Sequence, residues 1–181
     1  MLTEEQKKDA INTTQKWVET FIIGLNLCPF AKSPFQKEGI RFTVADCENS
    51  QMYVETFINE LEFLNKNKKT ETTLLIIPGF GKPEHLQAYL EFCEQIIIIN
   101  NWGSKYQIVS FHPYARFLGI APDSPKNLTG IAPYPVLHIL RTPSVDALEN
   151  AVKKDIHVQN DERLEKMTHE ELKKLWDKVM E

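Results

Sequence analysis

In the first half of the chain a polar segment gives way to the apolar run Thr72-Thr73-Leu74-Leu75-Ile76-Ile77-Pro78. A short, continuous run of this kind that stops at a proline is typical of a strand buried on both of its faces. We therefore predict that residues 72–78 form the centre of a sheet, and that the rest of the fold is arranged around it.

Three more strands are predicted around this centre. Ile40, Phe42 and Val44 alternate with polar residues, which is the period of a half-buried strand. Strand character returns at residues 106–111 and again at residues 136–140.

Apolar residues at helical spacing predict helices before, between and after these strands. The first helix is predicted to end at Gly24, which would supply a left-handed C-terminus. A later helix is predicted to begin with Thr142 as its N-cap and to bury a stripe of Val145, Leu148 and Val152.

We therefore predict an α/β fold, with a small central sheet of about four strands flanked by helices. Right-handed crossover connections would make at least three of these strands parallel, and an antiparallel fourth strand is also compatible with the pattern. The length of 181 residues suits one hydrophobic core, so residues 1–181 are predicted to form a single globular domain.

Composition and charge exclude several classes of protein. The net charge is −4 and basic residues are mixed with acidic ones, which argues against nucleic acid as a partner because phosphate binding needs clustered Lys and Arg. No stretch has the length of a membrane span and the N-terminus lacks a secretory pattern, so no membrane partner is expected. Three widely spaced cysteines fit reduced thiols, and we predict a cytoplasmic protein.

In open α/β sheets, ligands bind outside the carboxyl ends of the strands. The predicted strand ends here are Asp46 and Cys47, then residues 78–82, then His112. Loops that share one edge of the sheet would enclose one pocket, and the long loop of residues 114–132 would cover it.

Two residues are candidates for catalysis in that pocket. His112 follows a strand and precedes a proline that fixes its backbone, and we predict a general acid or base; the alternative is a histidine that hydrogen-bonds the loop it anchors. Cys28 precedes Pro29, which can start a short helix whose positive end, together with Lys32, would favour a thiolate nucleophile. The alternative for Cys28 is a small buried side chain, which its apolar neighbours support.

His138 and Arg141 are candidates for substrate binding. In a strand, His138 would share a face with Val136 and Leu140 and would be buried with its hydrogen bonds satisfied, while Arg141 would point to the opposite face. In a helix, His138 and Arg141 would lie on one side and form an anion site. The guanidinium of Arg141 suits a carboxylate or a phosphate, with a salt bridge as the alternative.

Asn127 and Lys82 are further candidates for substrate binding. Asn127 lies in a Pro-rich loop, where it either forms a turn or closes the pocket. Lys82 ends the segment Gly79-Phe80-Gly81-Lys82, whose backbone amides could hold an anion, although the segment lacks the length of a Walker loop.

Cys28, His112 and His138 have the chemistry of zinc or haem ligands, but no ligand-spacing motif supports a metal site. No metal is assigned for this reason, and the residues do not identify a cofactor. A metal or haem protein that uses these three side chains stays open as an alternative.

Several motifs, taken in order, are similar to one family. They are Trp17-Val18 through Lys32, Thr73-Leu74-Leu75-Ile76, Ser110-Phe111-His112-Pro113, Asn127, and Pro133-Tyr134-Pro135 through Arg141. Together they resemble the bacterial domain-of-unknown-function family numbered fourteen-fifteen, over most of the chain. The resemblance implies no reaction; it implies that the polar signature positions of the family are Cys28, His112, Asn127, His138 and Arg141.

Two positions depart from the family pattern. The family commonly has an aromatic residue in place of Ala115, and an Asn-Arg pair in place of Gly130-Ile131. The missing arginine weakens any anion site that depends on positive charge. Arg116 or Lys82 is therefore predicted to compensate in binding the substrate, unless the ligand itself differs.

The sequence thus predicts a protein with a pocket of Cys28, His112, Asn127 and Arg141 that binds or acts on a small, anionic metabolite. Whether the protein is an enzyme stays open, as does its oligomeric state. The alternative to a small-molecule pocket is a non-catalytic interaction module that uses the 114–132 loop as its partner surface.

Overall fold

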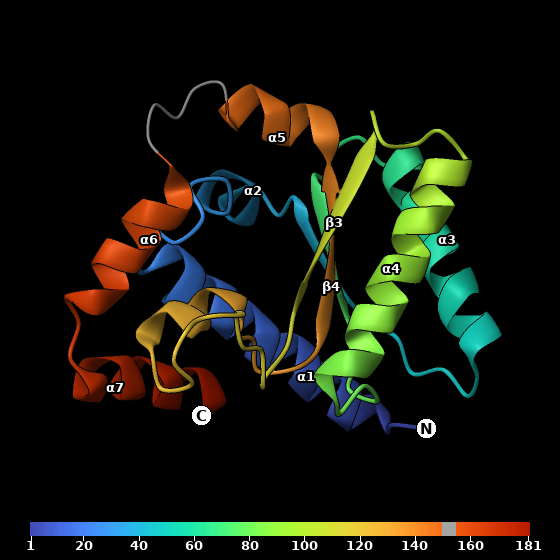
Figure 1. Ribbon diagram of the computed structural model, residues 1–181. Coiled ribbons are helices and arrows are strands. Elements are labelled where there is room, and N and C mark those ends of the chain that lie inside the picture. The colour runs from blue at the N-terminus through green and yellow to red at the C-terminus, as the bar shows by residue number, and fades with distance from the viewer. Residues whose placement is uncertain (150–154) are drawn as a thin grey trace.

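The computed structural model describes residues 1–149 and 155–181, and it places helices on both faces of a four-stranded sheet (Figure 1). The strands are β1 (Ile40–Val44), β2 (Thr72–Ile76), β3 (Tyr106–Phe111) and β4 (Val136–Arg141). Every residue of β2 is buried, which confirms its prediction as an interior strand. The α/β class and the four strands are confirmed as well, because each strand carries its own local apolar pattern.

The order of strands in the sheet is β1-β2-β4-β3. β1 and β2 are parallel, whereas β4 lies between β2 and β3 and is antiparallel to both. The prediction of at least three parallel strands is therefore corrected to one parallel pair. β3 runs in the direction of β1 and β2, but β4 occupies the edge of β2 with which a parallel β3 would have paired.

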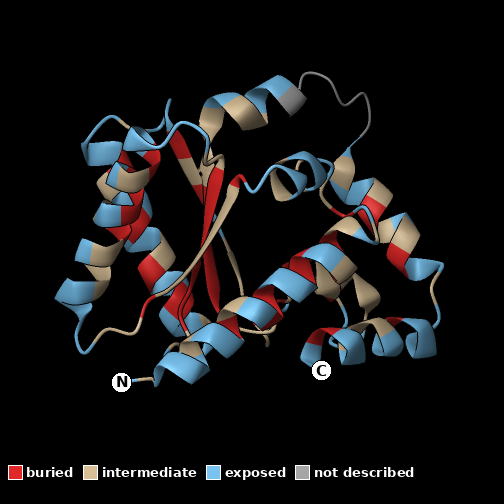
Figure 2. Ribbon diagram, turned by 180° about the vertical axis from the view of Figure 1, so that it is seen from behind, coloured by how far each residue is buried: buried red, intermediate tan, exposed pale blue. Residues whose placement is uncertain are grey.

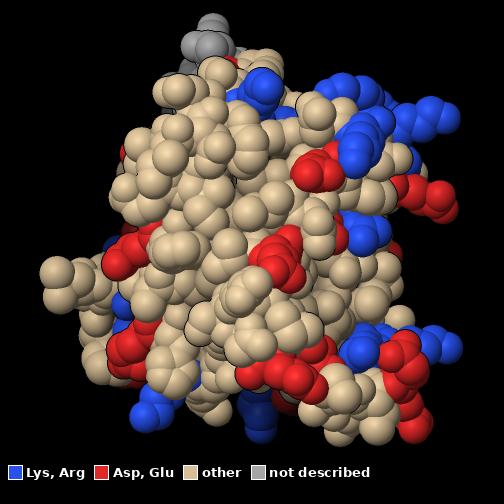
Figure 3. All heavy atoms as spheres, turned by 90° about the vertical axis from the view of Figure 1, so that its right-hand side faces the viewer, with Lys and Arg blue, Asp and Glu red and all other residues tan. Residues whose placement is uncertain are grey.

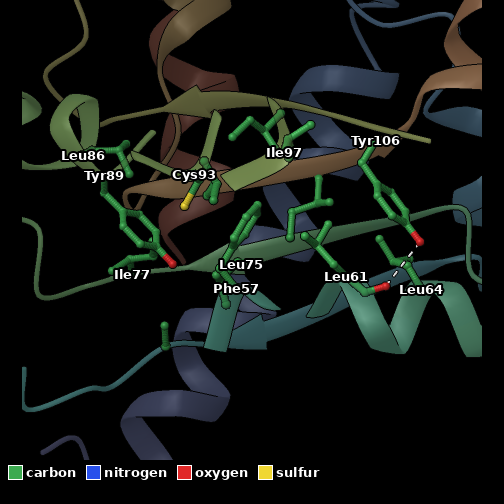
Figure 4. Close-up of a cluster of buried hydrophobic side chains, with 14 residues drawn as sticks. Phe57, Leu61, Leu64, Leu75, Ile77, Leu86, Tyr89, Cys93, Ile97 and Tyr106 are labelled. Carbon is green, nitrogen blue, oxygen red and sulfur yellow. Dashed lines mark hydrogen bonds between the residues drawn. The ribbon is translucent and has the colours of Figure 1, made fainter. Parts of the chain in front are cut away.

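One face of the sheet packs on α3 (Ser50–Lys66) and α4 (Pro83–Ile99), which lie side by side on the right of Figure 1. Figure 4 shows the core between them, where Phe57 of α3, Leu75 of β2 and Cys93 of α4 converge. The surface on this side of the molecule carries side chains of both signs of charge, scattered among uncharged ones (Figure 3).

The other face packs on a second set of helices: α1 (Glu4–Lys16), the π-helix η1 (Trp17–Ile23), α6 (Ile156–Glu165) and α7 (His169–Met180). Two short helices, α2 (Lys32–Gln36) and α5 (Thr142–Glu149), complete this side. Figure 2 shows that buried residues follow the strands and the sides of the helices that face them. Val152, predicted on the stripe of the helix that begins at Thr142, lies outside the described residues.

The first helix differs from its prediction at its C-terminal end. The backbone changes from α-helix to π-helix at Trp17, and Gly24 has an ordinary right-handed conformation with φ −58°. The left-handed residue is Asn26, with φ 49°. Gly24 is nevertheless suited to its position, because a Cβ atom there would overlap with the carbonyl oxygen of Thr20.

The carboxyl ends of β1, β2 and β3 lie at one edge of the sheet, as the sequence predicts. Across β4, Phe111 pairs with Val136, Val136 with Ile76, and Ile76 in turn with Val44. The loops after these three strands are therefore neighbours. Among residues 1–149 and 155–181, no helix combines the length and the apolar character needed to cross a membrane.

Candidate functional site

A cavity of about 1350 Å³ lies along the face of the sheet that η1 and α6 cover in part. Side chains of β3 and β4 on this face form its floor, and they include Val109, Phe111, His138 and Leu140. The walls come from η1, from the segment that leads to α2, and from α5 and α6; their apolar members include Val18, Ile22, Leu27, Val145 and Ile156. Beyond the edge strand β3 the cavity also reaches residues 83–91 of α4 and residues 115–117 of the long loop. The site thus extends along the sheet face, beyond the edge at which the sequence predicts a loop-enclosed pocket.

The π-helix contributes Trp17 to the cavity wall. Trp17 is 2% exposed, and its indole packs edge-on against Phe111 with 5.3 Å between the ring centroids. Its Nε1 atom is buried and, within the described part of the chain, has no hydrogen-bond partner. π-Helical turns are rare and occur frequently at functional sites, so this segment is a notable place for an unpaired donor.

His138 lies on β4 and pairs in register with Leu74 of β2 and Val109 of β3. Its Nε2 is buried without a hydrogen-bond partner in the described residues, and burial lowers the pKa of the imidazole to about 4. The ring is therefore neutral at physiological pH. The strand predicted for His138 is confirmed, and the helical alternative with Arg141 is wrong. The predicted buried and satisfied side chain is not found as such, because the residue is half-buried and its Nε2 has no partner in the described residues.

His112 is 4% exposed, and both of its ring nitrogens are hydrogen-bonded to the backbone. Nδ1 accepts from the N–H of Tyr114 at 3.0 Å, so Nε2 carries the proton and donates to the carbonyl of Phe80 at 2.9 Å. This geometry matches the alternative of a histidine that anchors its loop. His112 borders the cavity, but neither nitrogen is available to a substrate in this arrangement.

Cys28 borders the cavity from the turn that precedes α2. The backbone amides of Phe30 and Ala31 favour the thiolate, but burial has the larger effect and raises the pKa of the Cys28 thiol above that of a free cysteine. At neutral pH the side chain is therefore a protonated thiol. The helix begins at Lys32 and not at Pro29 as predicted, so the amides that favour the thiolate belong to the turn before α2, and desolvation outweighs them.

Arg141 also borders the cavity, yet its guanidinium is bonded to backbone carbonyls. Nη2 donates to the carbonyl of Leu64 at 2.6 Å, and Nε donates to that of Thr70 at 3.0 Å. These carbonyls belong to the last turn of α3 and to the loop before β2. The side chain thus fixes the end of α3 beside the sheet, a role that neither the carboxylate site nor the salt bridge of the sequence prediction describes.

Asn127 lies in the 3₁₀-helix η2 (Pro125–Gly130) and is 2% exposed. Its Oδ1 accepts from the N–H of Phe117 at 3.0 Å, and its Nδ2 donates to the carbonyl of Ala121 at 2.8 Å. Asn127 therefore holds the long loop together. Of its two predicted roles, these bonds match the turn residue and not the residue that closes the pocket.

Five of the seven predicted site residues line the cavity: Cys28, His112, Arg116, His138 and Arg141. Asn127 and the exposed Lys82, which caps the N-terminus of α4, do not line it. No group of three His, Cys, Asp or Glu side chains in residues 1–149 and 155–181 is arranged to hold a metal ion. The alternative of a metal site at Cys28, His112 and His138 therefore gains no support from the geometry.

Sequence reasoning missed Trp17, Val109 and Phe111 as site residues. The apolar residues at positions 11–25 recur at the spacing of a regular α-helix and predict one through to Gly24. A π-helix has about one more residue in each turn, and this pattern does not reveal it. One signal was available: Ile108 and Val109 are consecutive apolar residues in β3, so one of them faces away from the α3 and α4 core.

The chain was compared with known proteins. The model of a family described as "Protein of unknown function (DUF1415)" matches residues 9–174, a range that contains every candidate site residue. The family resemblance predicted from the motifs is thereby confirmed. The comparison with curated proteins gave no match, and the comparison with solved structures gave none either.

Proposed function

The chain belongs to the DUF1415 family, and we propose that it binds a small organic molecule in the cavity along the sheet. The observation that carries this proposal is the open, mostly apolar cavity itself, bordered by two residues, Trp17 and His138, that each bury a ring nitrogen without a hydrogen-bond partner in the described residues. Buried polar groups nearly always have a partner, and an unpaired one costs about 1–3 kcal/mol. A molecule that displaces the side chains covering these nitrogens and supplies the partners would remove this cost.

The lining of the cavity supports the same proposal. Sites for small molecules are concave and mostly apolar, with a few polar groups that fix orientation. Here an apolar floor and walls surround the neutral imidazole of His138 and the protonated thiol of Cys28. The cavity exceeds the roughly 300–1000 Å³ of a usual small-molecule site, so we propose that the ligand fills only part of it.

We propose further that the ligand is anionic, with its acidic group at the rim. A charge in the middle of the cavity would lie among apolar and neutral side chains, which is costly. The exposed cations that border the cavity are Lys37, Lys69 and Arg116, whereas the guanidinium of Arg141 is held by carbonyls. The carboxylates of Glu71, Glu84 and Glu91 border it as well, so the acidic group is proposed to lie beside the cations and away from these side chains. The acid would therefore meet these exposed cations while the apolar body lies inside.

Binding is proposed in place of catalysis because the two predicted catalytic groups are not in reactive states. Both nitrogens of His112 are engaged, and Cys28 is a protonated thiol. Neither residue offers a free base or a nucleophile at neutral pH.

A fluorescence titration with 1-anilinonaphthalene-8-sulfonate, which has apolar rings and one acidic group, tests the proposal. Val109→Trp places a large side chain on the partly exposed cavity floor and should weaken dye binding about tenfold or more. Ile99→Trp is the matched control, because Ile99 is 76% exposed on α4 and does not line the cavity. No saturable binding, or equal binding to the wild type and both variants, would refute the cavity as the binding site.

A second candidate function, the interaction module, is favoured by the exposed apolar side chains of the 114–132 loop. Tyr114 is 66% exposed, Phe117 is 45% exposed and Leu118 is fully exposed. A photo-crosslinking residue at position 118 should then join the chain to a protein partner in cells, and one at the exposed position 68 should not. Equal or absent crosslinking at both positions would remove this candidate.

A further inference from the structure

Three aromatic rings from three different elements form a continuous row beside the cavity. The centroids of Trp17 in η1 and Phe111 in β3 are 5.3 Å apart with an interplanar angle of 66°. Phe111 and His138 in β4 follow at 6.3 Å and 39°. All three residues line the cavity, and this row is created only by the tertiary fold.

The two unpaired ring nitrogens of the site lie at the two ends of this row. Trp17 Nε1 is a donor only, so its partner must be a hydrogen-bond acceptor. His138 Nε2 belongs to a neutral imidazole, which donates or accepts there according to its tautomer. Both atoms are closed to solvent and Trp17 is 2% exposed, so hydrogen bonds to them and wide contact with the indole require a shift of the covering side chains. The rings of Phe111 and His138 belong to half-buried residues and can be contacted directly.

This row favours one class of ligand over another. A flat aromatic molecule gains from offset or edge-on ring contacts in addition to the burial of its apolar area, whereas an alkyl chain gains from the buried area alone. An alkyl acid could use the aliphatic part of the lining, such as Val18, Ile22 and Leu140, but it would leave the row of rings without a matching partner.

We propose that the molecule bound in this cavity is an aromatic or heteroaromatic acid. Its ring lies on the row formed by Trp17, Phe111 and His138, an acceptor on the ring or on its substituent turns toward Trp17, and its acidic group lies at the rim. This inference rests on the proposed function. It adds the class of ligand, which the apolar lining alone does not specify.

Two acids of equal charge and similar size distinguish the classes: 2-naphthoate and decanoate, each used to displace 1-anilinonaphthalene-8-sulfonate. The wild type should bind 2-naphthoate about tenfold more tightly than decanoate. Phe111→Leu removes the central ring and keeps an apolar side chain, so it should abolish this preference mainly by weakening 2-naphthoate. Thermal unfolding of the variant verifies that it is folded, and Val109→Trp, which blocks the floor, should weaken both acids.

The outcomes separate the two proposals. If the dye binds in the cavity but decanoate displaces it as well as 2-naphthoate does, or neither acid displaces it, the aromatic class is wrong while the cavity remains a binding site. A preference for 2-naphthoate that survives Phe111→Leu also overturns the inference, because the row of rings would not be its cause. If the dye itself does not bind, the proposed function fails first.

Discussion

Nε2 of His112 donates a hydrogen bond to the carbonyl oxygen of Phe80, 2.9 Å away, and thereby ties the end of β3 to the loop that follows β2. The Tyr114 N–H completes the pair of bonds at Nδ1. Both partners are backbone groups at the sheet edge where predicted ligand loops meet. His112 therefore stabilises this edge of the sheet, because both of its ring nitrogens form hydrogen bonds within the protein.

Replacing His112 should lower stability more than it changes ligand binding. His112→Ala removes two hydrogen bonds of a buried ring, and we expect a loss of about 2–3 kcal/mol in the free energy of unfolding, measured by urea denaturation. His85→Ala, at an exposed position of α4, is the control and should change little. If the variant keeps its stability but no longer binds the dye, His112 contacts the ligand and does not mainly stabilise the fold.

Arg141→Lys should destabilise the protein although the charge is kept. A single ammonium group cannot reproduce the fork that reaches the carbonyls of Leu64 and Thr70, so we expect a loss of about 1–3 kcal/mol in thermal or urea unfolding. Arg116→Lys, at an exposed position, should be nearly neutral. Equal effects of the two substitutions would contradict the structural role of Arg141.

His138 should make the protein less stable in acid. Burial lowers its pKa to about 4 from the 6.5 of a free histidine, so the unfolded chain takes up the proton first as the pH falls. Above about pH 6.5 His138 is neutral in both states and does not lower the free energy of unfolding. As the pH drops from about 6.5 toward 4, the free energy of unfolding falls by roughly 3 kcal/mol because only the unfolded chain is protonated at this residue. His138→Phe should flatten the curve of unfolding free energy against pH in that window. A histidine NMR titration that places the pKa of His138 near 6.5 would rule the mechanism out.

Gly24→Ala should be clearly destabilising. The new Cβ would overlap with the carbonyl oxygen of Thr20 at the end of η1, so the backbone would have to shift at a cost of about 2 kcal/mol or more. Gly81→Ala is the matched control, because nothing lies within 4 Å of a Cβ at that glycine. A tolerated Gly24→Ala would mean that the turn after η1 has an alternative conformation.

Cys28 should react more slowly with iodoacetamide at pH 7 than a cysteine in a short unstructured peptide. Burial raises its thiol pKa, and only the thiolate is nucleophilic. Mass spectrometry of the separate peptides supplies an internal reference, because Cys93 is fully buried with a pKa raised to about 12 and should be slower still. Alkylation of Cys28 faster than the peptide would support the nucleophile predicted from the sequence.

The sequence by itself determined the four strands and most of the helices, because those depend on the spacing of apolar residues within a few turns of chain. It also located the sheet edge where three loops meet, since residues 78–82 and His112 each follow a strand. Five of the seven site residues that it proposed do line one cavity. Local patterns were sufficient for these results, as the physical signal lies within each segment.

Only the tertiary structure decided what those side chains do. Arg141 bonds to Leu64, 77 positions earlier in the chain, and His112 bonds to Phe80, 32 positions earlier. The place of β4 between β2 and β3 is likewise a choice among pairing partners that lie far apart in sequence. Hydrogen-bond partners, burial and pKa shifts depend on neighbours in space, so the row of Trp17, Phe111 and His138 and the cavity beside it could be read only from the folded chain.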